Sequence, residues 1–118
     1  MLYHECIITN IQDRLTSWQD SMQFKFAEKD LVNLYETGQG PYPEAIIKAF
    51  FKKVQLIDKA KDENDLRAFK GNHFEKLQGE KNLYSIRLNI QFRLILELLK
   101  DGQCKIILIR EISKHYEK

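Results

Sequence analysis

Two arginines interrupt an otherwise apolar, strand-like stretch, LYSIRLNIQFRLILELL, at residues 83–99. A strand that only filled a hydrophobic core would not carry guanidinium groups at Arg87 and Arg93, because an unpaired buried charge is strongly destabilising. One interpretation is a solvent-exposed face on which the two arginines pair with Glu75 and Glu97. The other is a binding surface for a polyanion. The residues of this stretch leave both interpretations open.

The distribution of charge along the chain favours a polyanionic partner. Residues 1–21 hold one Lys or Arg and three Asp or Glu, and residues 22–69 hold eight of each kind. Residues 70–118 hold ten Lys or Arg against six Asp or Glu, so the positive excess lies in the part that contains the two arginines. Such an asymmetry is typical of proteins that bind polyanions, although a solvated strand face would give the same pattern.

The C-terminal segment REISKHYEK adds three further side chains that could take part in chemistry. Lys114, His115 and Tyr116 lie just beyond the last expected strand. A lone histidine near a chain end is usually a surface residue, but here it stands at the end of a sheet with an arginine-bearing face. The sequence has no Ser/His/Asp order with an elbow motif and no glycine-rich phosphate loop. Metal-ligand spacing is also missing, so neither a metal nor another cofactor is expected.

Length and composition limit the classes of protein to which the chain can belong. A chain of 118 residues with 43% hydrophobic and 31% charged residues predicts one globular domain. The apolar runs, such as IILI at 106–109, are far too short to span a membrane. The N-terminus lacks the features of a secretory signal, and Cys6 and Cys104 form no disulfide or zinc pattern. We therefore expect a cytoplasmic protein.

Apolar periodicity changes from helical spacing to strand spacing near Gly71. The expected helices lie at 8–19, within 28–40 and within 41–65, the last with Pro43 in its first turn. The expected strands lie at 22–26, 73–78, 82–89, 92–99 and 104–112. Residues 64–72 are expected to be a turn-like connector capped by Asn64 or Asp65, and Asp101-Gly102 is a hairpin signal. This order predicts an α+β fold in which two N-terminal helices pack on one face of a mainly antiparallel β-sheet.

Alternation along the expected strands separates the two faces of the sheet. In 92–98, the even positions are apolar, while Arg93, Ile95 and Glu97 lie on the other face. In 83–90, the even positions are again apolar, and Ser85, Arg87 and Asn89 share the other face. The positions expected on the helix side are Tyr84, Ile86, Leu88, Ile90, Phe92, Leu94, Leu96 and Leu98. Both arginines are thus expected on the face that the helices leave open.

The chain resembles the HigB branch of the RelE-like toxins of bacterial type II toxin–antitoxin systems. That family has a Leu-x-Gly turn, an aromatic-Ser-Ile-Arg strand, an Asn-x-x-aromatic-Arg segment and an end near a histidine. The matching segments here are Leu77–Gly79, Tyr84–Arg87, Asn89–Arg93 and Ile112–His115. MQFKFAEKDLVNLYETG also resembles the family's opening segment. The resemblance covers residues 22–118, which we expect to be the toxin domain, whereas residues 1–21 are an extension or follow an upstream start codon.

The resemblance implies a RelE-like fold and a metal-independent, ribosome-dependent endoribonuclease that cuts mRNA in the ribosomal A site. It also implies a cognate helix-turn-helix antitoxin of the HigA type, which neutralises the toxin and represses the operon by binding operator DNA. Arg93 would clamp the scissile phosphate, and His115 would act as general acid or base. The remaining site residues are predicted to be Lys76 and Lys114 as added positive charge, and Arg87, Tyr116 and His73 as RNA contacts.

Departures from the family pattern keep other functions open. Many members carry a histidine and a lysine in the strand before the glycine turn, where this chain has Glu75 and Gln78, and a tyrosine where it has Lys114. The identity of the general base is therefore left open. The same fold hosts ParE-type toxins that bind DNA gyrase, and a weakened toxin could survive as a partner of its antitoxin and operator. The sequence does not indicate codon preference or oligomeric state.

Overall fold

The computed structural model describes residues 22–79, 81–101 and 104–114 of the chain. The expected helix at 8–19 and the tail residues His115 and Tyr116 lie outside this part of the chain. Within it, the element order is close to that expected, with one additional helix and one parallel strand pair.

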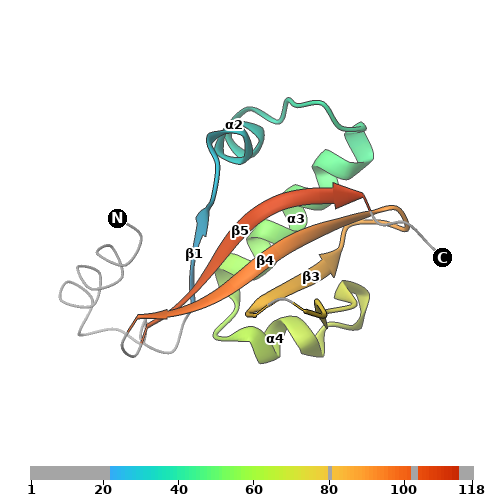
Figure 1. Cartoon of the computed structure of the whole chain (residues 1–118). Helices are drawn as coiled ribbons and strands as arrows, with labels where there is room; N and C mark the ends of the chain where they lie inside the picture. The colour runs from blue at the N-terminus through green and yellow to red at the C-terminus, as the bar shows by residue number, and fades with distance from the viewer. Residues whose placement is uncertain (1–21, 80, 102–103, 115–118) are drawn as a thin grey trace.

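Five strands form a single mixed sheet in the order β1-β5-β4-β3-β2 (Figure 1). The strands are β1 (Gln23–Phe26), β2 (Glu75–Lys76), β3 (Leu83–Arg87), β4 (Phe92–Asp101) and β5 (Cys104–Lys114). β2 to β5 pair antiparallel, as predicted, but β1 pairs parallel to β5, with Phe26 opposite Ile109. A parallel pair is possible here because helices and three strands separate β1 from β5 along the chain. The strand expected at 73–78 is reduced to two residues.

Among the described residues, three helices precede β2, one more than the two expected there. They are α2 (Lys29–Thr37), α3 (Glu44–Lys59) and α4 (Glu63–Ala68), and the short 3-10 helix η2 (Lys70–Asn72) follows them. α4 replaces the turn-like connector, and its cap is Asp62, whose Oδ1 accepts a hydrogen bond from the backbone N–H of Asn64 at 2.9 Å. None of the helices among the described residues is long and apolar enough to cross a membrane.

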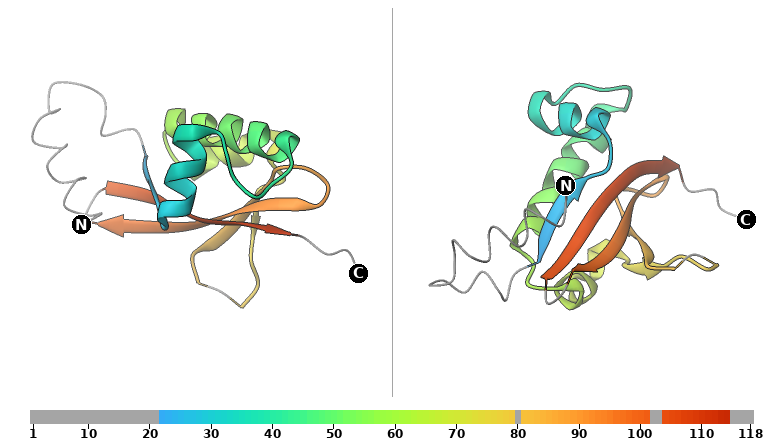
Figure 2. Two further views of the ribbon diagram at one scale, coloured as in Figure 1. Left: turned by 90° about the horizontal axis from the view of Figure 1, so that it is seen from above. Right: turned by 60° about the vertical axis from the view of Figure 1, so that its left-hand side comes forward.

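The hydrophobic core lies between the helices and one face of the sheet. α3 buries one stripe, formed by Ile46, Phe50, Val54 and Ile57, at the spacing of a helix face. Figure 2 shows α2 and α3 on one side of the sheet. Strand residues that pack into the same cluster include Ile86, Leu94, Leu96, Ile107 and Ile109. No helix of the described ranges covers the opposite face, which is the face that carries the arginines.

The predicted separation of the two faces is confirmed except at one turn. Leu94 and Leu96 are shut from solvent on the helix side, together with Ile86. Ile90, however, is 74% exposed, so its predicted place on the apolar face is wrong. β3 already ends at Arg87, and the side chain of Asn89 accepts hydrogen bonds from the backbone N–H groups of Gln91 and Phe92. This local turn competes with a longer strand and points Ile90 into solvent.

Candidate functional site

The centre of the candidate site is a pair of arginines that face each other across two strands. Arg87, the last residue of β3, lies directly opposite Arg93, the second residue of β4. Residues directly opposite each other in an antiparallel pair place their side chains on the same face. The next strand, β5, continues this row with Ser113 opposite Arg93. The short turn between β3 and β4 therefore brings two guanidinium groups, six residues apart in sequence, side by side.

Both guanidinium groups have buried N–H donors that lack a partner. Arg93 is only 9% exposed, and its Nη1 has no hydrogen-bond acceptor. Nε of Arg87 and Oγ of the neighbouring Ser85 are likewise buried without a partner. Buried polar groups are nearly always hydrogen-bonded in proteins, so this concentration on one face makes it a candidate site for a ligand that supplies acceptors. A ligand with several anionic oxygens, such as a phosphate, matches two guanidinium groups best.

The interpretation in which these arginines pair with Glu75 and Glu97 is not supported. Glu97 is instead bound by Arg110, whose Nη1 lies 3.0 Å from Oε1 of the glutamate. Glu75 takes part in no ion pair within 22–79, 81–101 and 104–114, and neither does Arg87 or Arg93. The two arginines are therefore like charges on directly opposite residues, an arrangement that destabilises a sheet. An anion bound between the two guanidinium groups would offset this repulsion.

A β-bulge in β5 determines which residue stands beside Arg93. Ile95 lies opposite Glu111, but the next residue of β4 lies opposite Ile109, so Arg110 is an extra residue in β5. An extra residue reverses the alternation of side chains beyond it. As a result, Ser113 rather than Ile112 lies opposite Arg93. Lys114 lies on the helix side of the sheet, where its Nζ is 6.0 Å from the centroid of the Phe92 ring.

The other predicted site residues do not gather on the arginine face. Lys76 lies opposite Tyr84 and therefore on the helix side of the sheet. His73 directly follows η2, is exposed, and adopts a left-handed backbone conformation with φ of 46°. His115 and Tyr116 lie outside the described residues. The structure thus brings together Arg87 and Arg93, whereas the catalytic and RNA-binding roles of all the predicted site residues stay predictions.

Glu75 is a polar residue on the arginine face that the sequence did not indicate as a site residue. It lies opposite Ser85, which is two residues before Arg87 on β3 and shares its face. The side chain of Glu75 is exposed. A residue diagonal to Arg87 across an antiparallel pair is about 7–8 Å away between Cα atoms, within reach of long side chains. The available signal was alternation, because apolar Phe74 and Tyr84 belong to the helix side and Glu75 must then face the other way.

A second acidic residue of this face, Glu111, is associated with Tyr42. The Tyr42 ring packs edge-on against Phe92, with ring centroids 6.3 Å apart. Burial raises the pKa of the Tyr42 hydroxyl, and the charges of Asp30, Glu111 and Glu28 raise this pKa further. The hydroxyl therefore stays protonated at neutral pH.

Within the described ranges, no group of three His, Cys, Asp or Glu side chains could hold a metal ion.

Comparison with known proteins agrees with this geometry. A family model described as the RelE-like toxin of type II toxin–antitoxin system HigB matches residues 24–108. The chain belongs to the HigB-like toxin family. Toxin HigB-1 of Vibrio cholerae is 40% identical over 84 residues, which cover 69% of this chain and 87% of the relative. An uncharacterized protein of Haemophilus influenzae is 34% identical over 73 residues, which cover 59% of this chain and 72% of that protein.

Solved structures show that the fold is that of the RelE and YoeB toxins. The YoeB-YefM complex from Staphylococcus aureus matches with a TM-score of 0.52 at 20% identity, over 80% of this chain and 98% of the other. The YoeB/ParE toxin from Agrobacterium tumefaciens matches with a TM-score of 0.51 at 16% identity, over 80% of this chain and 100% of the other. Recognition of the HigB-like family from the sequence is confirmed by the family model and by the Vibrio cholerae relative.

The unpaired arginines predict that this HigB-like toxin is less stable than its fold allows. We expect Arg87→Gln to raise the free energy of unfolding by up to about 1 kcal/mol at low ionic strength, because it removes a like charge opposite Arg93. Urea denaturation of both proteins measures this difference. Arg110→Gln is the matched control, since it removes a paired arginine from the same face and should not stabilise. A less stable Arg87→Gln variant would contradict the account of an unsatisfied pair.

Proposed function

We propose that this HigB-like toxin is an endoribonuclease that cuts mRNA in the A site of the ribosome, in the cytoplasm and without a metal ion. The observation that carries the proposal is the cross-strand pair of Arg87 and Arg93, whose buried donors have no partner among the described residues. Membership of the family supports it, because RelE-like toxins are generally endoribonucleases. Two adjacent guanidinium groups on an open sheet face are suited to grip a phosphodiester.

The proposed reaction uses the RNA itself as the nucleophile. The ribose 2′-oxygen attacks the adjacent phosphorus, a bond forms between them, and the bond from phosphorus to the 5′-oxygen of the next nucleotide breaks. The products are a 2′,3′-cyclic phosphate and a free 5′-hydroxyl. Negative charge grows on the phosphate oxygens during attack, and Arg87 and Arg93 stabilise this charge by donating hydrogen bonds to those oxygens.

Two proton transfers accompany this displacement. Glu75, which lies on the arginine face, is proposed to accept the proton of the 2′-hydroxyl. His115, one residue beyond the end of β5, is proposed to protonate the leaving 5′-oxygen, since histidine titrates near neutral pH. Tyr116 and His73 keep their proposed RNA contacts, whereas Lys76 and Lys114 lie on the helix side of the sheet and add positive charge only at longer range.

We also propose that the toxin has a protein partner, a helix-turn-helix antitoxin of the HigA type that neutralises it and brings it to operator DNA. The structural neighbour from S. aureus was solved as a complex of YoeB with YefM, which supports a protein partner for this fold. Co-purification of the tagged toxin with the product of the adjacent reading frame tests the pairing. An adjacent frame whose product neither binds the toxin nor relieves its toxicity would contradict it.

The ends of the cleaved RNA test the proposed chemistry. Purified toxin is incubated with ribosomes that hold mRNA, and the cut is mapped by primer extension. We expect a 2′,3′-cyclic phosphate on the upstream fragment, and no cleavage when the scissile nucleotide carries 2′-deoxyribose. A matched message with the 2′-deoxy substitution one nucleotide away should still be cut.

Other results would overturn the proposal. Upstream fragments that end in a 3′-hydroxyl would show that the 2′-oxygen is not the nucleophile. If induction of the toxin triggers a DNA damage response without loss of mRNA, a gyrase-binding toxin of the ParE type would be favoured. Tight antitoxin binding with no toxicity would indicate a catalytically inactive partner of the antitoxin.

A further inference from the structure

A second group of cations and aromatic rings lies at the edge of the molecule formed by α4, η2 and β2. We call it the basic–aromatic edge. Its members are Lys53, Arg67, Phe69, Lys70, His73, Phe74 and Lys76. These residues are not on the arginine face, and the proposed cleavage reaction assigns none of the aromatic ones a role.

Cations and rings are in direct contact along this edge. The guanidinium carbon of Arg67 lies 5.0 Å from the centroid of the Phe74 ring, whose centroid is 5.0 Å from that of Tyr84 in a stacked arrangement. Nζ of Lys53 lies 5.2 Å from the centroid of the Phe69 ring. Phe74 is thus covered by a cation and by another ring, whereas Phe69 is 53% exposed. An exposed phenyl ring beside a lysine is unusual for a residue that would otherwise join the core.

A buried asparagine holds this edge in place. Asn72 is shut from solvent, and its Oδ1 accepts a hydrogen bond from Nζ of Lys53 at 2.7 Å. Its Nδ2 donates to the backbone carbonyl of Leu66 at 2.9 Å. Asn72 therefore ties η2 to both α3 and α4, and it fixes the ammonium group next to the Phe69 ring. The ring and the charge are presented together by a rigid support.

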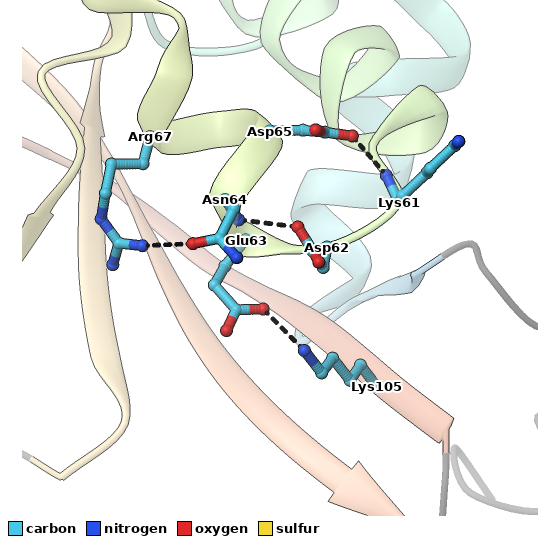
Figure 3. A network of polar contacts seen from close by, with 7 residues as sticks. All are labelled: Lys61, Asp62, Glu63, Asn64, Asp65, Arg67 and Lys105. Atoms are coloured by element: carbon cyan, nitrogen blue, oxygen red, sulfur yellow. Dashed lines mark hydrogen bonds and ion pairs between the residues drawn. The ribbon is translucent and has the colours of Figure 1, made fainter.

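Acidic side chains nearby are occupied elsewhere. Figure 3 shows the first turn of α4, where Asp62 binds the backbone N–H of Asn64, Asp65 binds that of Lys61, and Glu63 forms an ion pair with Lys105 at 3.2 Å. Glu75 faces the other side of the sheet. Within the part of the chain that the structure describes, the cations of the edge consequently take part in no ion pair.

We propose that the basic–aromatic edge binds the single-stranded RNA next to the scissile phosphate, with an unpaired base stacked on Phe69 and phosphates held by Lys70 and Lys76. The inference rests on the proposed function, in which the substrate is mRNA. Exposed aromatic rings flanked by cations bind single strands because unpaired bases offer their faces for stacking. In a duplex, the neighbouring base pairs would cover those faces. β2 is an edge strand of two residues, with Glu75 on the arginine face and Lys76 on the other face. A strand of RNA that leaves the arginine pair needs to pass only this strand to reach the edge.

Binding of an uncleavable RNA tests this assignment separately from catalysis. A fluorescent 2′-O-methyl oligonucleotide of about 12 nucleotides, within the range of single-strand site sizes, is titrated with the toxin. We expect Phe69→Leu to weaken binding about fivefold or more, because a leucine fills similar space but offers no ring for stacking. We expect Lys70→Gln to lower the slope of log affinity against log salt by about 0.7, the value for one phosphate contact on a single strand. Lys48→Gln is the matched control, since Lys48 lies on α3 and pairs with Glu44.

The outcomes separate this inference from the proposed function. Unchanged affinity in both edge variants, or equally tight binding of duplex RNA, would overturn the assignment of the edge even if the toxin cleaves mRNA normally. A wild-type toxin that binds the single strand through Phe69 but never cuts mRNA would support the edge and contradict the proposed function. Because Phe69 is largely exposed, a circular dichroism melt of Phe69→Leu should match the wild type, which excludes misfolding as the cause of weaker binding.

Discussion

Replacing Arg93 with alanine is expected to lower the rate of mRNA cleavage about 100- to 1,000-fold, the typical effect of removing one donor that stabilises charge in a transition state. The reason is geometric. Arg93 lies directly opposite Arg87, and its buried Nη1 has no acceptor, so its loss removes one of the two guanidinium groups of the pair. Cleavage is measured by primer extension on ribosome-bound mRNA at a saturating concentration of toxin.

Two further variants show whether the charge or its geometry matters. Arg93→Lys keeps a positive charge but loses the planar pair of donors, so we expect it to remain strongly impaired. Arg110→Gln removes an arginine from the same face that is already bound to Glu97, and its rate should equal that of the wild type. An Arg93→Ala variant that folds normally and cleaves at the wild-type rate would show that the arginine pair is not the phosphate clamp.

Replacing Glu75 with glutamine is expected to lower the rate about 100- to 10,000-fold, the usual contribution of a general base. Glutamine keeps the size of the side chain but cannot accept the proton of the 2′-hydroxyl. Glu75 is exposed and has no ion pair within the described residues, so the substitution should leave the free energy of unfolding nearly unchanged. The rate is measured under single-turnover conditions, so that ribosome binding and product release do not mask the chemical step.

Glu111→Gln is the matched control for this experiment. Glu111 shares the arginine face, and its charge raises the pKa of Tyr42. We expect its loss to leave cleavage unaffected while the pKa of Tyr42 falls slightly towards its ordinary value. If Glu111→Gln abolishes cleavage and Glu75→Gln does not, the general base has been assigned to the wrong strand. If His115→Gln alone abolishes cleavage, the histidine performs the proton transfer that is proposed here for Glu75.

Alternation of apolar and polar residues was sufficient to predict which face of the sheet carries Arg87 and Arg93. That inference succeeded because period-two alternation is a local property of each strand, and one buried face fixes it. It failed at Ile90, where an asparagine side chain forms the turn, and it did not anticipate α4, whose six residues follow the cap at Asp62. Each of these departures comes from a side-chain hydrogen bond to the backbone, which apolar periodicity does not record.

Pairings between distant strands could not be obtained from the sequence. The parallel contact of β1 with β5 joins residues about 80 positions apart, and no local pattern specifies it. The bulge at Arg110 has a larger consequence for the site. Without it, the register of Leu96 with Ile109 would place Ile112 opposite Arg93; with it, Ser113 lies there and Lys114 lies on the helix side. One extra residue in β5 therefore decides which C-terminal side chains can reach the phosphate.

The most direct test of the arginine pair is to observe it while it holds a phosphate. The toxin, labelled with ¹⁵N in its arginines, is titrated with an RNA that contains 2′-deoxyribose at the scissile position, and the Nε–H signals of Arg87 and Arg93 are followed by NMR. The account predicts that both signals shift together as the RNA binds, and that Arg110 does not respond. RNA binding that leaves the signals of Arg87 and Arg93 unchanged would contradict it.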